Sequence, residues 1–469
     1  MLDAVVVGSG PNGLAAAVEL ARRGRSVAVL EGASTIGGGT RTEELIEPGH
    51  WHDICSAVHP LGIASPYFRQ LPLGRFGLEW LVPDLQLSHP LDGGRAVALS
   101  QSLEDTAAML GADGVRYRRT VVPLLTEWDN VLAGALSPLQ SVWRRPFTMT
   151  RFGRLAIRSA ESIASRFALD ASRALIAGLA AHSITRLSAA ATGGVALTLG
   201  VAAHADGWPV ARGGSRAIAA ALAGYLRELG GTVETGRWVK SVDDLPRSRT
   251  IYLDTAPAAA ARIAGSRIGS RMARRLTSWR HGPGAHKVDW ILDGPIPWAD
   301  PLSGRAGTVH VGGSFEAIAA AEAAAVAGDA PTDPFVLVAQ PSLVDESRAP
   351  AGRHIVWGYC HVPHGYDGDA TDVVEAQIER FAPGFRDRIV GRHVHSASRV
   401  GAHNPNNVGG DIGGGAISLR RLLVGPRIAP NPYRIGDGIY LCSAAAPPGA
   451  GVHGMSGYNA VRYSIAEGA

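Results

Sequence analysis

The first 31 residues follow the pattern of a β-strand, a glycine-rich turn, an α-helix and a second β-strand. Residues 4–7 are apolar and predict a buried strand, and residues 14–23 predict the helix. Between them, Gly8 permits a tight turn, Gly10 lets the backbone approach a pyrophosphate, and Gly13 lets the helix pack closely on the strand. The N–H groups at the start of the helix can bind an anion. The sequence therefore predicts a βαβ unit that binds a dinucleotide.

The residue that ends the second strand indicates which dinucleotide is bound. Residues 26–30 lead into Glu31, whose carboxylate suits the two hydroxyls of an adenosine ribose and repels a 2′-phosphate. This acid favours FAD or NAD over NADP. A glycine-rich loop at residues 37–41 is expected to lie flat against the rest of a long cofactor, with Arg41 available to a phosphate. NAD would not need such a loop, so the cofactor expected is FAD.

Length and charge limit the number of domains and the kinds of partner. A chain of 469 residues exceeds what one hydrophobic core usually serves, so we expect two domains, which can be interleaved. The 45 basic and 41 acidic residues leave a net charge of +4, which is too small to indicate nucleic-acid binding. The partners expected are a small-molecule substrate, hydrophobic or amine-like, and oxygen or another electron acceptor. The sequence leaves a homo-oligomer open.

Cysteine usage and the start of the chain indicate the compartment. Cys55, Cys360 and Cys442 lie far apart and lack Cys-x-x-Cys spacing, which suits a reducing compartment and argues against a disulfide scaffold or a zinc site. We predict no metal site. The first strand begins too early for a signal or transit peptide, and the alanine-rich run at residues 189–203 is too short to span a membrane. We therefore expect a soluble, cytoplasmic protein.

Apolar and turn patterns along the chain predict an α/β fold. Residues 103–200 are expected to be mostly helical, and strands are expected at residues 286–293 and 354–362. We expect a Rossmann-type FAD-binding domain built from discontinuous segments, with an inserted α+β substrate domain of a mixed sheet and helices. The boundaries expected are residues 1–100, 200–265 and 395–469 for the FAD-binding domain, and residues 101–199 and 266–394 for the substrate-binding domain.

Aromatic and basic residues interleave over residues 143–157, and two structures can explain the pattern. Segments at a membrane interface mix these residue types, so a peripheral membrane contact is one interpretation. The other is an amphipathic surface helix whose arginine stems cover apolar surface, and we favour it.

Four segments together resemble a known family. They are the N-terminal fingerprint, the loop at residues 37–41, residues 209–215 and the closing segment at residues 448–457. They are similar to the phytoene-desaturase-like branch of the FAD-dependent amine-oxidase-fold enzymes, and more closely to its NAD(P)/FAD-dependent oxidoreductase members. The resemblance implies that FAD is held by Gly8, Gly10, Pro11, Asn12, Gly13, Glu31, Gly38, Gly39, Thr40, Arg41, Val239, Ser443, Gly451, Val452, His453, Gly454 and Met455.

The resemblance is incomplete after the last predicted strand. Much of the superfamily carries Gly-Asp there, and its carboxylate meets the ribityl-pyrophosphate region. This chain carries Cys442-Ser443 instead, so Ser443 would substitute as a neutral hydrogen-bonding group.

A second similarity concerns a lysine. Lys287-Val288, followed by Trp290, is similar to the amine-oxidase strand whose lysine holds a water against flavin N5. A cation there could stabilise negative charge on the flavin or polarise water during reoxidation. The alternative is a surface-strand lysine with a solvated amine, because a lysine among alternating apolar residues normally points outward.

Several histidines are further candidates. His453 lies in the predicted flavin-proximal turn and either acts on the flavin as a base or hydrogen-bond partner, or caps the last helix. His361 shares one strand face with Trp357 and Tyr359, which is either the substrate wall or the packed side of the sheet. His52 and His59 follow the glycine loop and are either flavin-attachment sites or ordinary hydrogen-bonding residues. The glycine-rich stretch at residues 404–415 is either a lid or a surface turn.

The reaction expected is a dehydrogenation, in which a hydride passes from a substrate C–H to flavin N5 and leaves a C=C or C=N bond. Lys287, His453 and His361 are the candidate catalytic residues. Three alternatives stay open. They are a flavin amine oxidase, a redox-neutral isomerase that uses reduced FAD, and a flavin-free escort-type binding protein on the same fold.

Overall fold

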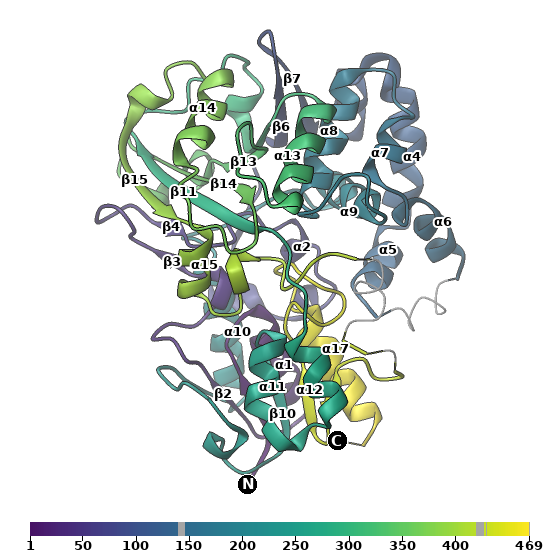
Figure 1. Ribbon diagram of the computed structural model, residues 1–469, viewed down its shortest axis with the longest axis vertical. Coiled ribbons are helices and arrows are strands. Elements are labelled where there is room, and N and C mark those ends of the chain that lie inside the picture. Colours follow the sequence, from purple (N-terminus) through teal and green to yellow (C-terminus); the bar gives the residue numbers. More distant parts are fainter. Residues whose placement is uncertain (139–145, 419–425, 428, 469) are drawn as a thin grey trace.

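The computed structural model describes residues 1–138, 146–418, 426–427 and 429–468 (Figure 1). The segment at residues 143–157, expected to be an amphipathic surface helix or a membrane-interface segment, therefore begins outside the described residues. Its remainder forms α6 (Pro146–Ala156), which buries Met149 and Phe152 and exposes Phe147. Among the described residues, every helix is too short or too polar to cross a bilayer.

The first sheet has six strands drawn from distant parts of the chain, and it lies near the N-terminus in Figure 1. Its core strand Leu2–Val7 is apolar and buried from Ala4 onward, as expected for a parallel sheet covered on both faces. All its neighbouring pairs are parallel except the pair at one edge, in which β16 and β17 are antiparallel. The strand order is β16 (Arg434–Gly436), β17 (Ile439–Leu441), β10 (Ser248–Leu253), β1 (Leu2–Val7), β2 (Val27–Leu30) and β9 (Thr232–Glu234).

Helices α1 (Pro11–Arg22), α10 (Arg216–Glu228) and α17 (Met455–Ala466) pack together beside this sheet. The contact between α1 and α17 is unusually close. A Cβ atom at Gly457 would lie 1.8 Å from the carbonyl oxygen of Asn12, so only glycine fits there. The closing helix of the chain is thereby held against the opening dinucleotide turn.

The second sheet has seven strands and is mixed, as expected, since β6 pairs in parallel with β12 and the other pairs are antiparallel. Helix α14 (Thr371–Phe381) covers one face, where Trp290 Nε1 donates to Glu375 Oε1 over 2.9 Å. Helix α13 (Phe315–Ala327) contacts β14, and helix α8 (Asp170–Ala181) contacts β6 and β7. The strand order is β15 (Ile389–His395), β11 (Gly284–Leu292), β14 (His354–Val362), β13 (Val336–Ala339), β12 (Ala306–Val311), β6 (Leu85–Leu91) and β7 (Arg95–Ser100).

The helical character expected for residues 103–200 is present. The helices are α3 (Leu103–Met109), α4 (Gly114–Thr126), α5 (Trp128–Ala135), α6, α7 (Ala160–Ala164), α8 (Asp170–Ala181) and α9 (Thr192–Ala205). Further elements are the short strands β3 (Thr42–Glu43), β4 (His52–Asp53), β5 (Trp80–Leu81) and β8 (Val210–Ala211), and the helices α11 (Pro257–Ala264), α13 (Phe315–Ala327) and α15 (Ala397–His403).

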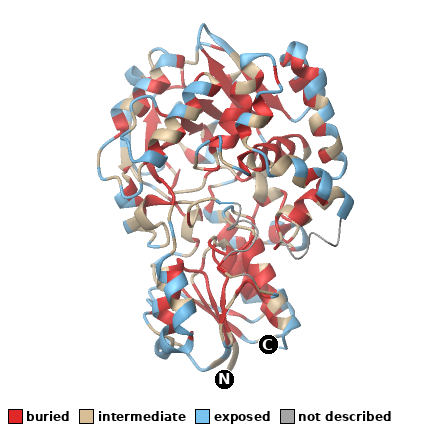
Figure 2. Cartoon of the chain, turned by 45° about the vertical axis from the view of Figure 1, so that its right-hand side comes forward, coloured by how far each residue is buried: buried red, intermediate tan, exposed pale blue. Residues whose placement is uncertain are grey.

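One segment lies in a different sheet from the one its position in the chain suggested. Residues 85–100 were placed with the nucleotide-binding domain, but β6 and β7 belong to the second sheet because Leu87 of β6 pairs with Thr308 of β12. Buried strands occupy the interior of both halves of the molecule, and exposed residues lie mainly on the outer helices (Figure 2). The cavity described next lies between the two sheets.

Candidate functional site

A cavity of about 1290 Å³ runs from the dinucleotide turn to the second sheet. Most residues predicted to hold the cofactor line it. They are Gly8, Gly10, Pro11, Asn12, Glu31, Gly38, Gly39, Thr40, Arg41, Val239, Ser443, Gly451 and Val452. The remaining predicted contacts, Gly13, His453, Gly454 and Met455, are not among the described lining residues.

The glycines of the turn are required by close backbone contacts. Gly8 has φ +99°, in the left-handed region that favours glycine. A Cβ atom at Gly13 would lie 2.2 Å from the carbonyl oxygen of Gly8. Pro11 stands at the first turn of α1, where its fixed φ suits a helix start. The start of α1 therefore lies directly against the end of β1, as the sequence predicted.

Glu31 and Arg41 form the polar part of this end. Glu31 Oε2 accepts hydrogen bonds from Ser9 N at 2.9 Å and Ser9 Oγ at 2.6 Å, and Ala33 N donates to Oε1. Arg41 Nη2 lies 3.5 Å from Glu31 Oε1. Arg41 Nε and Asn12 Oδ1 are buried and make no hydrogen bond within the described structure. Because buried polar atoms normally have partners, these two are suited to a polar ligand in the cavity.

Asp254 is a site residue that sequence reasoning missed. It follows β10, and its Oδ2 accepts a hydrogen bond from Gly13 N at 2.9 Å, at the N-terminal end of α1. Burial and the nearby Glu31 raise the pKa of Asp254 to about 7, despite the hydrogen bond from Gly13. The sequence feature that could have indicated it is the position of Asp254 directly after an apolar strand. Because β10 is the parallel neighbour of β1, the carboxyl ends of the two strands share one edge of the sheet.

The C-terminal turn approaches the same cavity from another side. His453 is fully buried, and its Nδ1 accepts a hydrogen bond from Met455 N, the first residue of α17, at 3.0 Å. Its carbonyl oxygen accepts a hydrogen bond from Ser65 Oγ. Burial lowers the pKa of His453 to about 4, so the ring is neutral at neutral pH. This contact agrees with the helix-capping alternative for His453. Its catalytic role stays a prediction.

Aromatic side chains of β14 line the opposite end of the cavity. Trp357 and Tyr359 are edge-on, with ring centroids 5.2 Å apart, and both line the cavity. His182, at the end of α8, also lines it and was not predicted from the sequence. Its Nε2 lies 3.0 Å from His310 Nε2, and burial lowers its pKa to about 3. This end therefore combines apolar walls with neutral imidazoles.

Two predicted catalytic residues lie beside this wall, on the same face of the second sheet. Lys287 is 3% exposed, its Nζ binds Asp289, and it lies 5.7 Å from the centroid of the Trp357 ring. A solvated surface lysine is therefore ruled out. His361 Nδ1 lies 2.7 Å from Glu322 Oε1. Neither Lys287 nor His361 is among the described lining residues, so their catalytic assignment stays a prediction.

Of the remaining candidates, some line the cavity and one does not. His59 lines the cavity, and its Nε2 is 2.8 Å from Ser215 Oγ, whereas His52 is not among the described lining residues. Much of the stretch at residues 404–415, including Asn406 and Gly414, lines the cavity. That stretch is therefore part of the site and not a turn remote from it.

The chain is similar in sequence and in fold to known oxidoreductases. Residues 6–71 match the family model described as NAD(P)-binding Rossmann-like domain. The chain is 25% identical to pyridine nucleotide-disulfide oxidoreductase domain-containing protein 2 of Rattus norvegicus, over 98% of this chain and 92% of that protein. An oxidoreductase structure from Methanosarcina mazei matches with a TM-score of 0.65 and 16% identity, over 99% of this chain and 100% of that one.

A putrescine oxidase structure matches with a TM-score of 0.62 and 17% identity, over 99% of this chain and 98% of that one. The chain shares its fold with these two structures. The predicted amine-oxidase fold with a Rossmann-like nucleotide-binding domain is therefore confirmed.

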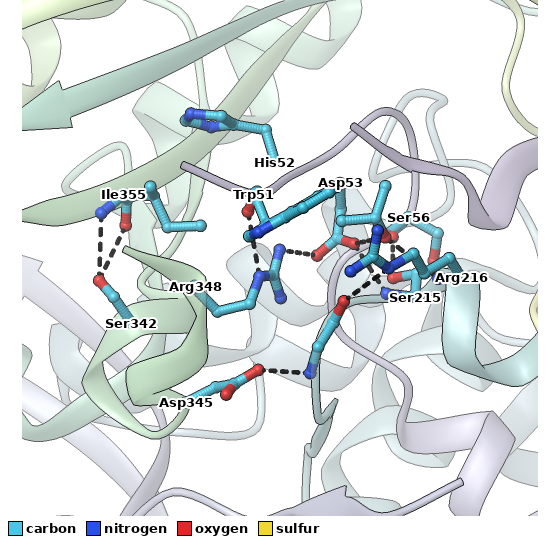
Figure 3. Close-up of polar contacts among 12 residues, drawn as sticks. Trp51, His52, Asp53, Ser56, Ser215, Arg216, Ser342, Asp345, Arg348 and Ile355 are labelled. Atoms are coloured by element: carbon cyan, nitrogen blue, oxygen red, sulfur yellow. Dashed lines mark hydrogen bonds and ion pairs between the residues drawn. The ribbon is translucent and has the colours of Figure 1, made fainter. Parts of the chain in front are cut away.

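A buried ion pair joins β4 to the segment between β13 and β14 of the second sheet. Figure 3 shows Arg348, which lies between β13 and β14, beside Trp51 and Asp53. Arg348 Nη2 lies 2.8 Å from Asp53 Oδ2, and its Nε donates to the Trp51 carbonyl oxygen over 3.0 Å. Asp53 Oδ1 also accepts a hydrogen bond from Ser215 N, just before α10. This network holds the loop at residues 51–59, part of which lines the cavity, in place.

Proposed function

We propose that the chain is an FAD-dependent oxidoreductase of the dehydrogenase or desaturase type, which takes a hydride from a substrate C–H and forms a C=C or C=N bond. The observation that carries this proposal is the single cavity of about 1290 Å³. It connects a dinucleotide turn at one end with an aromatic pair, Trp357 and Tyr359, at the other. A two-part cofactor and a substrate would meet in such a space.

The residues present fit FAD. The backbone around Gly10 and Gly38 favours glycine, since a Cβ at Gly10 would lie 2.6 Å from Asp254 Oδ2 and one at Gly38 would lie 3.2 Å from Gly10 Cα. Glu31 would accept from the ribose hydroxyls, and the unpaired Arg41 Nε would donate to a phosphate. Ser443 and Val452 line the part of the cavity next to the C-terminal turn, where the flavin half would lie.

When bound, the flavin would supply the hydride acceptor, and the chain would supply position and a dry environment. Trp357 and Tyr359 would hold an apolar substrate by their rings. Lys287, beside Trp357, would place its positive charge near the same end of the cavity, but its ammonium is already bound to Asp289. We therefore assign Lys287 an electrostatic role on the wall and not direct contact with substrate.

An amine oxidase is the second candidate. It is favoured by the edge-on aromatic pair at the substrate end of a chain with the putrescine oxidase fold. An amine substrate would lie against the two rings, as the neutral amine. Release of hydrogen peroxide with amines, and not with alkenes or alcohols, would distinguish this candidate from the dehydrogenase.

The first test is whether the purified protein carries or takes up FAD. We expect the visible absorption spectrum of a bound flavin, and anaerobic bleaching by a substrate whose product has lost two hydrogens by mass. Conversion without a mass change, only after chemical reduction of the flavin, would indicate the isomerase. A colourless protein that does not bind added FAD would contradict the proposal and favour the escort-type binding protein.

The position of Asp254 predicts that FAD affinity depends on pH. Its carboxyl has a pKa of about 7 and lies at the start of α1, where the FAD pyrophosphate would bind. The carboxyl is neutral below that pH and negative above it, so it repels the pyrophosphate only when the pH is high. We expect FAD affinity to fall by up to about tenfold for each pH unit above 7.

The measurement is FAD titration by calorimetry between about pH 6 and pH 9, with two buffers of different ionisation enthalpy to count protons taken up. Asp254→Asn should remove both the pH dependence and the proton uptake. Asp329→Asn is the control, because Asp329 is exposed and distant from the cavity lining. Equal wild-type affinities at the two pH extremes would show that Asp254 does not oppose the pyrophosphate.

A further inference from the structure

A group of titratable side chains lies on one face of β11 and β15, beside the cavity wall formed by Trp357 and Tyr359 but outside the described lining residues. In the antiparallel pairing of these strands, Asp289 stands opposite His393, and Lys287 stands opposite His395. Residues two apart on a strand point to the same side, so all four side chains share one face. One ligand atom from each of Asp289, His393 and His395 lies within 4.8 Å of the other two.

The polar atoms of this group are poorly satisfied by the protein. Asp289 is fully buried, and His395 is 8% exposed. Within the described structure, Asp289 Oδ1, His393 Nδ1 and His395 Nδ1 make no hydrogen bond. The rings of His393 and His395 are also close, with centroids 4.5 Å apart. Burying polar atoms without partners costs free energy, so such a group usually serves a ligand.

The two oxygens of Asp289 have different neighbours. The Lys287 ammonium binds Oδ2, whereas Oδ1 lies 3.5 Å from Nδ1 of His52 on β4. The carboxylate is therefore oriented by its neighbours while Oδ1 is left without a hydrogen bond. A cation that binds this carboxylate would share it with the Lys287 ammonium.

We propose that Asp289, His393 and His395 form a binding site for a divalent transition-metal ion such as Zn²⁺. Two imidazole nitrogens and one carboxylate oxygen are a donor set that first-row metals accept, and three protein ligands leave a position open for water. The metal would join β11 to β15, at the edge of the second sheet. None of these three residues is among the described lining residues of the cavity, although the ring of His395 lies 6.0 Å, centroid to centroid, from that of His403, which lines it.

The test is equilibrium dialysis of the tag-free, metal-stripped full chain against Zn²⁺, with elemental analysis. We expect one Zn²⁺ per chain for the wild type, and affinity at least about tenfold weaker for His393→Ala and for His395→Ala. His354→Ala is the matched control. His354 lies on β14 in the same sheet, is partly exposed and is outside the ligand group, so its loss should leave the affinity unchanged.

A second measurement needs only the wild type, in case the variants do not fold. Zinc X-ray absorption of the loaded protein should show two imidazole nitrogens and a carboxylate oxygen in the metal's coordination shell, and Zn²⁺ should raise the melting temperature. Failure of the wild type to bind stoichiometric Zn²⁺ would overturn the proposal. Folded His393→Ala and His395→Ala variants with wild-type affinity, or a coordination shell without imidazole, would overturn it equally.

Discussion

Replacement of Arg348 by methionine is expected to lower the free energy of unfolding by about 3–5 kcal/mol. Arg348 is fully buried and is paired with Asp53, which is 1% exposed. Methionine keeps the apolar stem but removes the guanidinium, so the Asp53 carboxylate would remain in the interior without its counter-charge. The loss is large because it leaves a buried charge uncompensated, and not because the pair itself contributes that much.

The free energy of unfolding of the Arg348→Met variant is also expected to depend on pH. In the wild type, burial raises the pKa of Asp53, but Arg348 and the hydrogen bonds from Ser215 and Thr42 outweigh this and hold it below 3.8. Without Arg348, the folded pKa is expected to exceed the unfolded one. The folded state would then bind the proton more tightly, so the variant's deficit in stability should shrink as the pH falls towards about 4 and grow as it rises.

Urea denaturation and thermal melting of the variant at several pH values would measure this effect. Arg353→Met is the control, since Arg353 follows in the same loop but is partly exposed. The double variant Arg348→Met/Asp53→Asn should recover part of the loss, because it removes the buried charge. An Arg348→Met protein as stable as the Arg353→Met control would show that the pair is not needed.

The second large effect is expected for Gly13→Ala. The new Cβ would lie 2.2 Å from the Gly8 carbonyl oxygen and 2.9 Å from Asp254 Oδ2, so α1 must move away from the end of β1. Overpacking of this kind costs about 1–3 kcal/mol. Since the strain falls on the turn that would hold the pyrophosphate, FAD affinity should weaken by about 10- to 100-fold.

Gly74→Ala separates this effect from glycine replacement in general. Gly74 has no heavy atom within 4 Å of its expected Cβ position and lies outside the cavity lining. FAD titration of both variants, with circular dichroism to verify folding, gives the comparison. Unchanged FAD affinity in folded Gly13→Ala would argue that the cofactor does not depend on this turn.

The parts of this protein that were predicted well are those specified by neighbours in the chain. The strand, turn and helix of the first 31 residues follow from local patterns, and Gly13 is required by a contact within the same βαβ unit, with the Gly8 carbonyl oxygen. Glu31 could be placed from its position at the end of the second strand. The helices of residues 103–200 were likewise visible from apolar spacing.

The burial of Lys287 could not be predicted from the alternation of polar and apolar residues in its strand. An alternating strand predicts an outward lysine, but all of β11 is buried, because β14 and β15 flank it, α14 covers one face and the cavity wall lies on the other side. Alternation with a period of two residues distinguishes the two faces of a strand. It does not reveal that both faces are covered.

The sequence by itself determined the nucleotide-binding unit and most of the residues that line the cavity near it. Only the tertiary structure decided that Asp254 lies at the start of α1, that Arg348 pairs with Asp53, and that Asp289 faces two histidines of β15. The physical reason is the same in each case. These side chains come from segments far apart in the chain, and strand register and domain packing, which no local pattern contains, bring them within bonding distance.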